Sequence, residues 1–252
     1  MNVLSIGNSF SEDAQCYLNK IARADSKNGV FTWNLMIGGC PLSTHFKNMK
    51  QENEEAYVLQ VNGFSTGAKI SLKKALFAMH WDVITLQQVS RLSFDYDSYQ
   101  PYLNELVAYV KKCSPKSKIV IHETWAYLPD SEILHNLGYE THNDMYRAVA
   151  ACYDKAAKEI NADAIIPSGY AMKTLLELGA PVIHRDSIHA NDLGRFTIAL
   201  TWYQALTGRD IKDVDFSHLD FDRDLTADEI ELSKKASLEA VKKYGYEIKS
   251  NA

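Results

Sequence analysis

Short apolar runs alternate with longer amphipathic patterns along the whole chain, and this alternation limits the fold more than any other feature. Such alternation is typical of strands and crossover helices that build a parallel sheet. We expect strands at residues 3–6, 32–37, 83–86, 118–122 and 164–166. We expect helices at residues 14–24, 68–79, 99–112, 143–160, 171–178, 191–206 and 227–244. The pattern therefore predicts an α/β fold around a five-stranded parallel sheet.

One domain over residues 1–252 is predicted, because no linker rich in Pro, Gly or Ser divides the chain and no repeat or low-complexity stretch occurs. The polar segment 40–66 does not fit the alternation and is long for a loop. Loops of that length in compact domains are usually functional or partly helical. We interpret it as an excursion beside the functional site.

Charge and hydropathy exclude two classes of partner. The net charge of −5 and the isoelectric point near 5.9 give no basic surface for nucleic acid. No apolar run approaches the roughly 18 residues of a membrane span. The expected localisation is cytoplasmic if Met1 is the native start, and extracytoplasmic if a signal peptide has been removed. The sequence leaves the oligomeric state open.

The first predicted strand runs into a tight turn, Gly7-Asn8-Ser9, and a helical pattern follows at once. Ser9 is thereby placed at the carboxyl end of a buried strand and close to a helix N-terminus. Backbone N–H groups and the helix dipole favour developing negative charge at such a position. Ser9 is therefore a candidate nucleophile, although a serine after Gly-Asn more often serves as a turn or helix cap.

Near the other end of the chain, Asp186 precedes His189 by three residues. A serine nucleophile needs a base that accepts its proton and a carboxylate that orients the base. His189 and Asp186 are the candidates for these two roles. The alternative is a surface Asp-x-x-His pair, in which Asp186 caps the helix predicted from Asn191.

Two further strand ends carry groups that could bind an oxyanion, and ligands bind at the carboxyl ends of strands in open parallel sheets. Gly38-Gly39 follows the second strand, where a backbone N–H can approach a substrate closely. Gln87-Gln88 ends the third strand. The N–H groups of Ser9 and Gly39 and one glutamine amide could together form an oxyanion hole.

These blocks resemble the SGNH (GDSL-like) hydrolases, and more closely a branch of esterase-like proteins in which Gly-Asn-Ser-Phe-Ser replaces Gly-Asp-Ser-Leu. The resemblance covers residues 3–206, through the blocks GNSFSEDA, GGCPL, WDVITLQQ, TWAY and Asp186-x-x-His189. It implies a flavodoxin-like, three-layer αβα sandwich. It also implies Ser9 as nucleophile, His189 as base, Asp186 as its partner, and Gly39 with an amide of the third block as oxyanion donors.

The third block departs from the family pattern. The family usually has Gly-x-Asn-Asp there, whereas this strand ends in Gln87-Gln88-Val89-Ser90. A glutamine can replace asparagine as a donor, with a reach longer by about one methylene. Of the two, Gln87 is preferred, because this branch resembles a Leu-Gln-x-x-Ser pattern, and Gln88 remains the alternative.

Three residues are candidates for substrate binding. Trp125 and Tyr127 follow the fourth strand, where aromatic rings could form a platform for a sugar; packing in the core is the equal alternative. Cys40 follows Gly38-Gly39 in a loop that faces the predicted site. The four cysteines are scattered without Cys-x-x-Cys spacing, which indicates neither zinc nor a disulfide framework.

Together these features predict a serine hydrolase of ester bonds that needs no metal and no organic cofactor. The resemblance implies a small acyl group, most plausibly acetyl, removed from a carbohydrate; the partner would be a small-molecule or carbohydrate ester. A lipid esterase or thioesterase is the alternative within enzymes. A non-catalytic carbohydrate-binding protein on a hydrolase scaffold is the alternative outside them.

Overall fold

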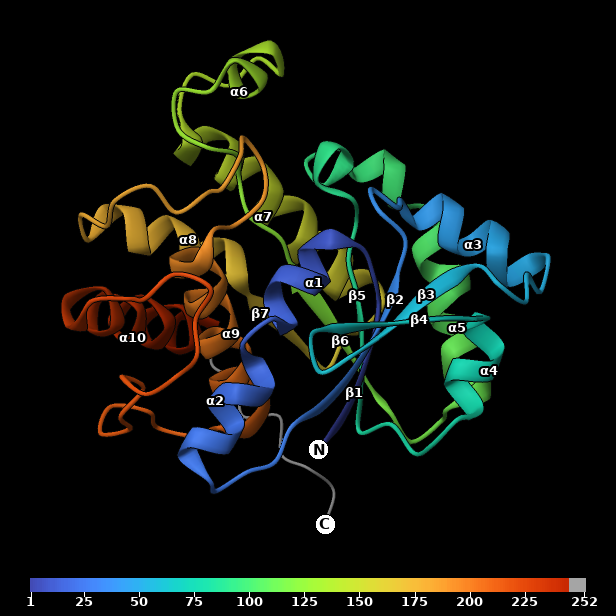
Figure 1. Ribbon diagram of the computed structural model, residues 1–252. Helices are drawn as coiled ribbons and strands as arrows, with labels where there is room; N and C mark the ends of the chain where they lie inside the picture. The colour runs from blue at the N-terminus through green and yellow to red at the C-terminus, as the bar shows by residue number, and fades with distance from the viewer. Residues whose placement is uncertain (245–252) are drawn as a thin grey trace.

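A seven-stranded sheet forms the centre of the protein in the computed structural model, which describes residues 1–244 (Figure 1). The strand order is β4-β3-β2-β1-β5-β6-β7. The strands are β1 (Asn2–Gly7), β2 (Phe31–Met36), β3 (Tyr57–Val61), β4 (Phe64–Ile70), β5 (Val83–Leu86), β6 (Lys118–Glu123) and β7 (Ala164–Pro167). Five of them, β2, β1, β5, β6 and β7, run parallel, and β3 and β4 extend the sheet as an antiparallel hairpin.

Helices cover both faces of the sheet and make a three-layer sandwich (Figure 1). The helices are α1 (Ser9–Gln15), α2 (Leu18–Asp25), α3 (Leu42–Lys50), α4 (Leu72–Phe77), α5 (Tyr102–Cys113), α6 (Glu132–Asn136), α7 (His142–Glu159), α8 (Ser168–Glu177), α9 (Asp192–Thr207) and α10 (Ala227–Tyr244). Short 3₁₀ turns lie at η1 (Ser90–Leu92) and η2 (Tyr96–Tyr99). No helix within residues 1–244 is long and apolar enough to cross a membrane.

The two faces of the sheet make two separate cores because side chains alternate along each strand. Val3 of β1 and Val83 of β5 pack with helices α1, α2, α8, α9 and α10. Leu4 of β1 and Ile84 of β5 pack on the other face with α3, α4, α5 and α7. Burial on both faces explains why the central strands read as continuous apolar runs.

The expected α/β fold is confirmed, and the expected strand number is too small by two. All five predicted parallel strands are present, but segment 40–66 holds α3 and most of the β3–β4 hairpin instead of a loop. The helix expected at residues 68–79 is shorter, because β4 continues to Ile70 and α4 begins only at Leu72. The helix expected at 14–24 is divided into α1 and α2.

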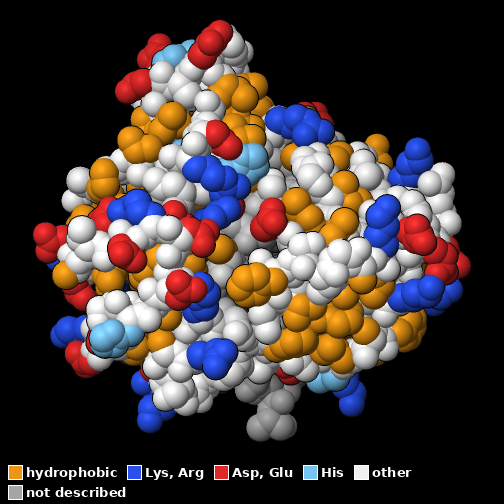
Figure 2. All heavy atoms as spheres, in the orientation of Figure 1, with side chains coloured by type: hydrophobic (Ala, Val, Ile, Leu, Met, Phe, Trp, Pro, Cys, Tyr) orange, Lys and Arg blue, Asp and Glu red, His pale blue; other side chains and the backbone are white. Residues whose placement is uncertain are grey.

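Charge on the surface is mixed on the face shown in Figure 2, where acidic and basic side chains alternate over the helices. Apolar side chains gather at the lower right of that view, in the region of the hairpin and α4. Phe64 of β4 and Phe77 of α4 are the most exposed large apolar side chains of these elements, at 65% and 64%.

Candidate active site

Ser9 is the first residue of α1 and follows β1 through a tight turn. Asn8 caps the helix, and its side-chain oxygen accepts a hydrogen bond from the Phe10 N–H at 3.0 Å. The turn requires glycine at position 7, because a Cβ there would lie 2.1 Å from Ser11 Oγ. Close packing of α1 on the end of β1 thus presents Ser9 at the carboxyl edge of the sheet.

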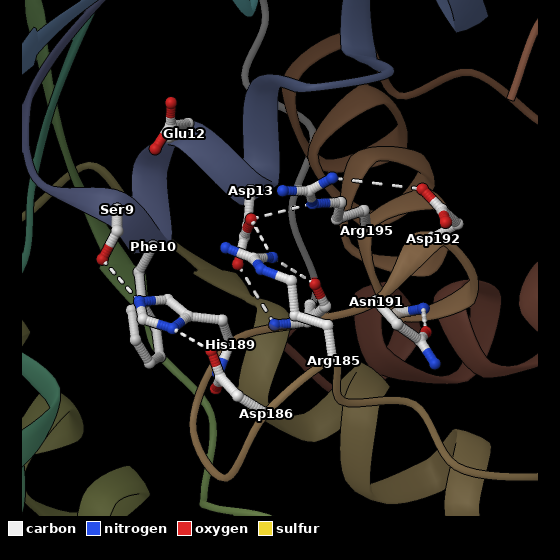
Figure 3. Close-up of polar contacts among 12 residues, drawn as sticks. Ser9, Phe10, Glu12, Asp13, Arg185, Asp186, His189, Asn191, Asp192 and Arg195 are labelled. Carbon is white, nitrogen blue, oxygen red and sulfur yellow. Dashed lines mark hydrogen bonds and ion pairs between the residues drawn. The ribbon is translucent and has the colours of Figure 1, made fainter. Parts of the chain in front are cut away.

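Ser9, His189 and Asp186 form a continuous chain of hydrogen bonds (Figure 3). His189 Nε2 lies 3.0 Å from Ser9 Oγ, and His189 Nδ1 lies 2.8 Å from Asp186 Oδ2. Nδ1 donates to the carboxylate, which leaves Nε2 free to accept the serine proton. The three side chains therefore have the mutual geometry of nucleophile, base and orienting acid.

Asp186 is held in its ionised form. Partial burial acts to raise its pKa, but hydrogen bonds from the backbone N–H groups of His189 and Ile188 and from the His189 ring outweigh this and lower the pKa to about 2. The same backbone bonds fold residues 186–189 into a tight loop. The carboxylate and the imidazole are thus fixed relative to each other by the loop itself.

A buried carboxylate, Asp13, joins this loop to the nucleophile helix (Figure 3). Asp13 is fully buried and accepts hydrogen bonds from Arg185 Nη1 at 2.7 Å, from Arg195 Nε at 2.8 Å and from the Ala190 N–H at 3.1 Å. Two guanidinium groups and a backbone donor satisfy the buried charge. Through Arg185 and Ala190, Asp13 thereby fixes both ends of the segment that carries Asp186 and His189.

The Gly38-Gly39 loop lies next to the serine turn. Gly39 has φ +60°, a left-handed conformation that favours glycine. Asn8 Nδ2 donates to the Cys40 carbonyl at 3.2 Å, and Arg91 Nη1 donates to the Gly39 carbonyl at 3.1 Å. These bonds hold the loop through its carbonyl groups. The N–H groups of Ser9 and Gly39 have no hydrogen-bond partner within residues 1–244.

Both glutamines of the third block are buried and hydrogen-bonded inside the protein. Gln87 Oε1 accepts from Ser11 Oγ and from His122, and its Nε2 donates to Asn8 Oδ1 at 2.7 Å. Gln88 points the other way, since its oxygen accepts from the Leu42 N–H and its Nε2 donates to Ser98. Opposite directions are expected for neighbours on an extended segment. Only Gln87 lies on the side of the serine turn.

The three candidates for substrate binding lie in the interior. Trp125 is fully buried, stacks on Phe10 with ring centroids 4.0 Å apart, and donates its indole N–H to the Ile188 carbonyl at 3.0 Å. Tyr127 is buried and donates to Ser90, while burial raises the pKa of the Cys40 thiol to about 12. This placement matches the packing alternative for both rings. Trp125 thus contacts Phe10, which follows Ser9, and Ile188, which precedes His189.

Asp13, Arg185 and Arg195 were not expected from the sequence to lie beside Ser9 and His189. Asp13 lies in the first block, and a carboxylate four residues after the nucleophile on a short helix was the only signal. Its partners lie 172 and 182 positions away in the chain, so sequence spacing could not pair them. Among residues 1–244, no group of three or more His, Cys, Asp or Glu side chains is arranged to hold a metal ion.

Comparison with known families identifies the chain at the level of family. The profile of the family described as a domain of unknown function, DUF4886, matches residues 2–240. The chain belongs to the DUF4886 family. A solved structure of a DUF4886 protein from Bacteroides uniformis ATCC 8492 is 30% identical, with a TM-score of 0.88 over 100% of this chain and 98% of that one. No curated protein matches the sequence.

More distant structures relate this DUF4886 protein to the SGNH and GDSL-like fold. A protein from Slackia heliotrinireducens, provisionally named an SGNH hydrolase, is 19% identical, with a TM-score of 0.57 over 81% of this chain and 97% of that one. A member of the lipolytic G-D-S-L family from Veillonella parvula DSM 2008 is 16% identical, with a TM-score of 0.50 over 80% and 95%. At these identities the similarity shows a shared fold.

Proposed function

We propose that this protein is a serine hydrolase of ester bonds and that Ser9 forms an acyl-enzyme. The observation that carries the proposal is the unbroken hydrogen-bonded chain from Ser9 Oγ through His189 to Asp186. Nucleophile and base within 3.0 Å, with the base oriented by an ionised carboxylate, are the defining geometry of this chemistry.

In the first step, Ser9 Oγ attacks the ester carbonyl carbon while its proton moves to His189 Nε2. Asp186 stabilises the resulting imidazolium through its bond to Nδ1. The tetrahedral intermediate then collapses, the C–O bond to the alcohol breaks, and His189 gives the proton to the leaving oxygen. In the second step, His189 takes a proton from water, the hydroxide attacks the acyl carbon, and the carboxylic acid leaves as Ser9 recovers its proton.

Backbone N–H groups of Ser9 and Gly39 are the donors we propose for the oxyanion. Neither has a hydrogen-bond partner in the described part of the chain, and the bond from Asn8 to Cys40 holds the two segments together. Preorganised donors of this kind lower the barrier by about 3–4 kcal/mol each in related chemistry. Gly39 is suited to the role, because it has no side chain to keep the carbonyl carbon away.

For the substrate we propose a small ester, with acetyl as the acyl group and a carbohydrate as the alcohol. The support is the resemblance of the first and last sequence blocks to SGNH hydrolases. A panel of nitrophenyl esters from acetyl to octanoyl, with O-acetylated oligosaccharides, tests it. Preference for long chains or for thioesters would instead indicate the lipid esterase or thioesterase alternative.

A fluorophosphonate probe tests the proposal directly, because it labels only an activated serine. We expect the wild type to be labelled by the probe and, in a separate assay, to release the acid and alcohol of an ester substrate. Ser9→Ala should give neither result. Ser65→Ala, on the exposed strand β4, is the matched control and should behave as wild type. Full activity of Ser9→Ala would refute the proposal, and binding of carbohydrate without turnover by the wild type would favour the non-catalytic alternative.

A further inference from the structure

A continuous hydrogen-bond relay of neutral side chains crosses the interior below the serine turn. It runs from Trp202 on α9 through Ser168, His122 and Gln87 to Asn8. Trp202 Nε1 donates to Ser168 Oγ at 3.2 Å, and His122 Nε2 lies 3.1 Å from the same oxygen. His122 Nδ1 lies 2.7 Å from Gln87 Oε1, and Gln87 Nε2 donates to Asn8 Oδ1 at 2.7 Å. All five side chains are buried.

The direction of every bond in this relay follows from its Asn8 end. The Phe10 N–H donates to Asn8 Oδ1, so Gln87 turns its NH₂ group toward this oxygen and its own carbonyl oxygen toward His122 Nδ1, which must therefore donate. The neutral His122 ring then accepts at Nε2 from the Ser168 hydroxyl, which in turn accepts from the Trp202 indole N–H. Complete burial keeps the imidazole neutral, with its pKa lowered to about 3. The Gln87 amide is thereby fixed with its NH₂ group toward Asn8.

Asn8 connects this relay to both segments of the proposed oxyanion hole. Its oxygen accepts from Gln87 Nε2 and from the Phe10 N–H, and its nitrogen donates to the Cys40 carbonyl. The Phe10 bond sets the turn that carries the Ser9 N–H. The Cys40 bond sets the loop that carries the Gly39 N–H. A rotation of the Asn8 amide would release both segments together.

We propose that Gln87 is a positioning residue, which acts through Asn8 to hold the Ser9 and Gly39 N–H groups in place for the oxyanion. This inference rests on the proposed esterase function and deepens it. In this proposal Gln87 positions the oxyanion donors, whereas the sequence predicted that Gln87 itself is one of them. The competing explanation is that the second N–H of the Gln87 amide itself contacts the oxyanion.

A double-mutant cycle separates these two explanations. Gln87→Met keeps the side-chain volume and removes both the carbonyl oxygen and the NH₂ group of the amide. Asn8→Ser keeps a helix-capping oxygen but is too short to reach Gln87 and Cys40. If Gln87 acts through Asn8, each single variant lowers kcat by roughly ten- to a hundredfold with KM little changed. A displacement of the oxyanion donors by about 1 Å reduces the rate by that order. The double variant should then be no slower than the slower single variant.

Direct donation by Gln87 predicts a different result, in which the two fold-losses multiply in the double variant. That outcome, or a Gln87→Met variant with wild-type kcat, would overturn the proposal. Gln204→Met is the matched control, because Gln204 is equally buried on α9 and its side-chain amide donates to Ser237 of α10, away from Asn8. It should leave kcat unchanged, and an equal loss there would show a general effect of removing a buried amide.

Fluorophosphonate labelling keeps the two proposals distinguishable. If Ser9→Ala is not labelled but the losses of kcat multiply in the double variant, the positioning role of Gln87 is rejected and the proposed esterase function stands. Labelling and turnover that persist in Ser9→Ala would reject the esterase itself. If Gln87→Met does not fold, Gln87→Asn serves the same cycle, because its shorter stem cannot span His122 and Asn8 together.

Discussion

Arg185 donates a hydrogen bond to Asp13 at 2.7 Å, and this contact joins the nucleophile helix to the histidine loop. Asp13 lies four residues after Ser9, and Arg185 lies four residues before His189. The distance between Ser9 and His189 therefore depends on the ion pair between Arg185 and a buried carboxylate as well as on the Ser9–His189 bond. Arg195 on α9 donates to the same carboxylate oxygen at 2.8 Å, so Asp13 also joins α1 to α9.

Asp13→Asn should weaken both folding and catalysis. Both guanidinium groups bond one carboxylate oxygen and the Ala190 N–H bonds the other, so the amide of asparagine must turn its NH₂ group toward at least one of these donors and no longer carries the negative charge that faces the arginines. Leaving a buried hydrogen-bonding group without its partner in this way costs about 1–3 kcal/mol. We expect the free energy of unfolding in urea to fall by that order and kcat to fall at conditions where the variant is folded. Asp220→Asn is the control, because the Lys20–Asp220 pair has an Asp side chain 96% exposed; unchanged stability of Asp13→Asn would contradict this role.

The order of the triad variants is a second prediction. His189→Ala should abolish turnover at every pH, because Ser9 then lacks the imidazole that accepts its proton. Asp186→Asn should retain more activity than His189→Ala, since the backbone loop still positions the ring. Because hydrogen bonds lower the Asp186 pKa to about 2, this carboxylate stays ionised at neutral pH and adds no inflection to the profile of kcat/KM there. Steady-state pH profiles of wild type, His189→Ala and Asp186→Asn measure this order. Equal turnover of His189→Ala and wild type at any pH would exclude His189 as the base.

The strand positions and the meeting of Ser9, His189 and Asp186 could be predicted from the sequence for simple physical reasons. Central strands buried on both faces are apolar runs, and residues at their carboxyl ends meet at one edge. Ser9 and His189 were expected together on that ground, and the structure places them 3.0 Å apart. The antiparallel hairpin was missed, because β4 is exposed along its length and carries no apolar pattern. Its signal was the Asn62-Gly63 turn, with φ of +50° and +85°.

The direction of a polar side chain could not be predicted from its position in the chain. An amide at a strand end reads equally as an oxyanion donor or as part of a buried network. Gln87 belongs to such a network because His122, on the neighbouring strand β6, fills the space beside it. The same limit applies to Trp125, whose burial depends on Phe10 and Ile188 from opposite ends of the chain.

Trp125→Phe tests whether this ring supports the site or binds substrate. Phenylalanine keeps an aromatic contact with Phe10 and removes the indole bond to the Ile188 carbonyl, next to His189. A supporting role predicts a lower kcat, by about threefold to tenfold for one neutral hydrogen bond, with KM unchanged. Steady-state kinetics on acetylated oligosaccharides and nitrophenyl acetate measure both constants. A rise in KM confined to the sugar substrate would restore the platform interpretation.

The stability of the protein should depend on pH through Glu123 at the end of β6. Burial raises its pKa to about 7, with opposing hydrogen bonds from the Tyr244 hydroxyl and the Tyr170 N–H. A carboxyl whose pKa is higher in the folded state stabilises the fold fully below its unfolded pKa of 4.5, and this contribution is lost as the pH rises through 7. Glu123→Gln cannot ionise and avoids that loss.

We therefore expect the unfolding free energy of Glu123→Gln, relative to wild type, to increase by about 2–3 kcal/mol between about pH 5 and about pH 8. Urea titrations at the two pH values measure this difference. Glu239→Gln, at an exposed position of α10, is the matched control and should give a flat difference. The buried His122 has the opposite effect on stability: because its pKa is lowered in the folded state, the fold weakens as the pH falls below about 6.5. Variant and wild type must therefore be compared at the same pH, so that this effect cancels. A difference that stays constant from acid to base would mean that Glu123 is ionised in the folded protein throughout, against the assignment made from its burial.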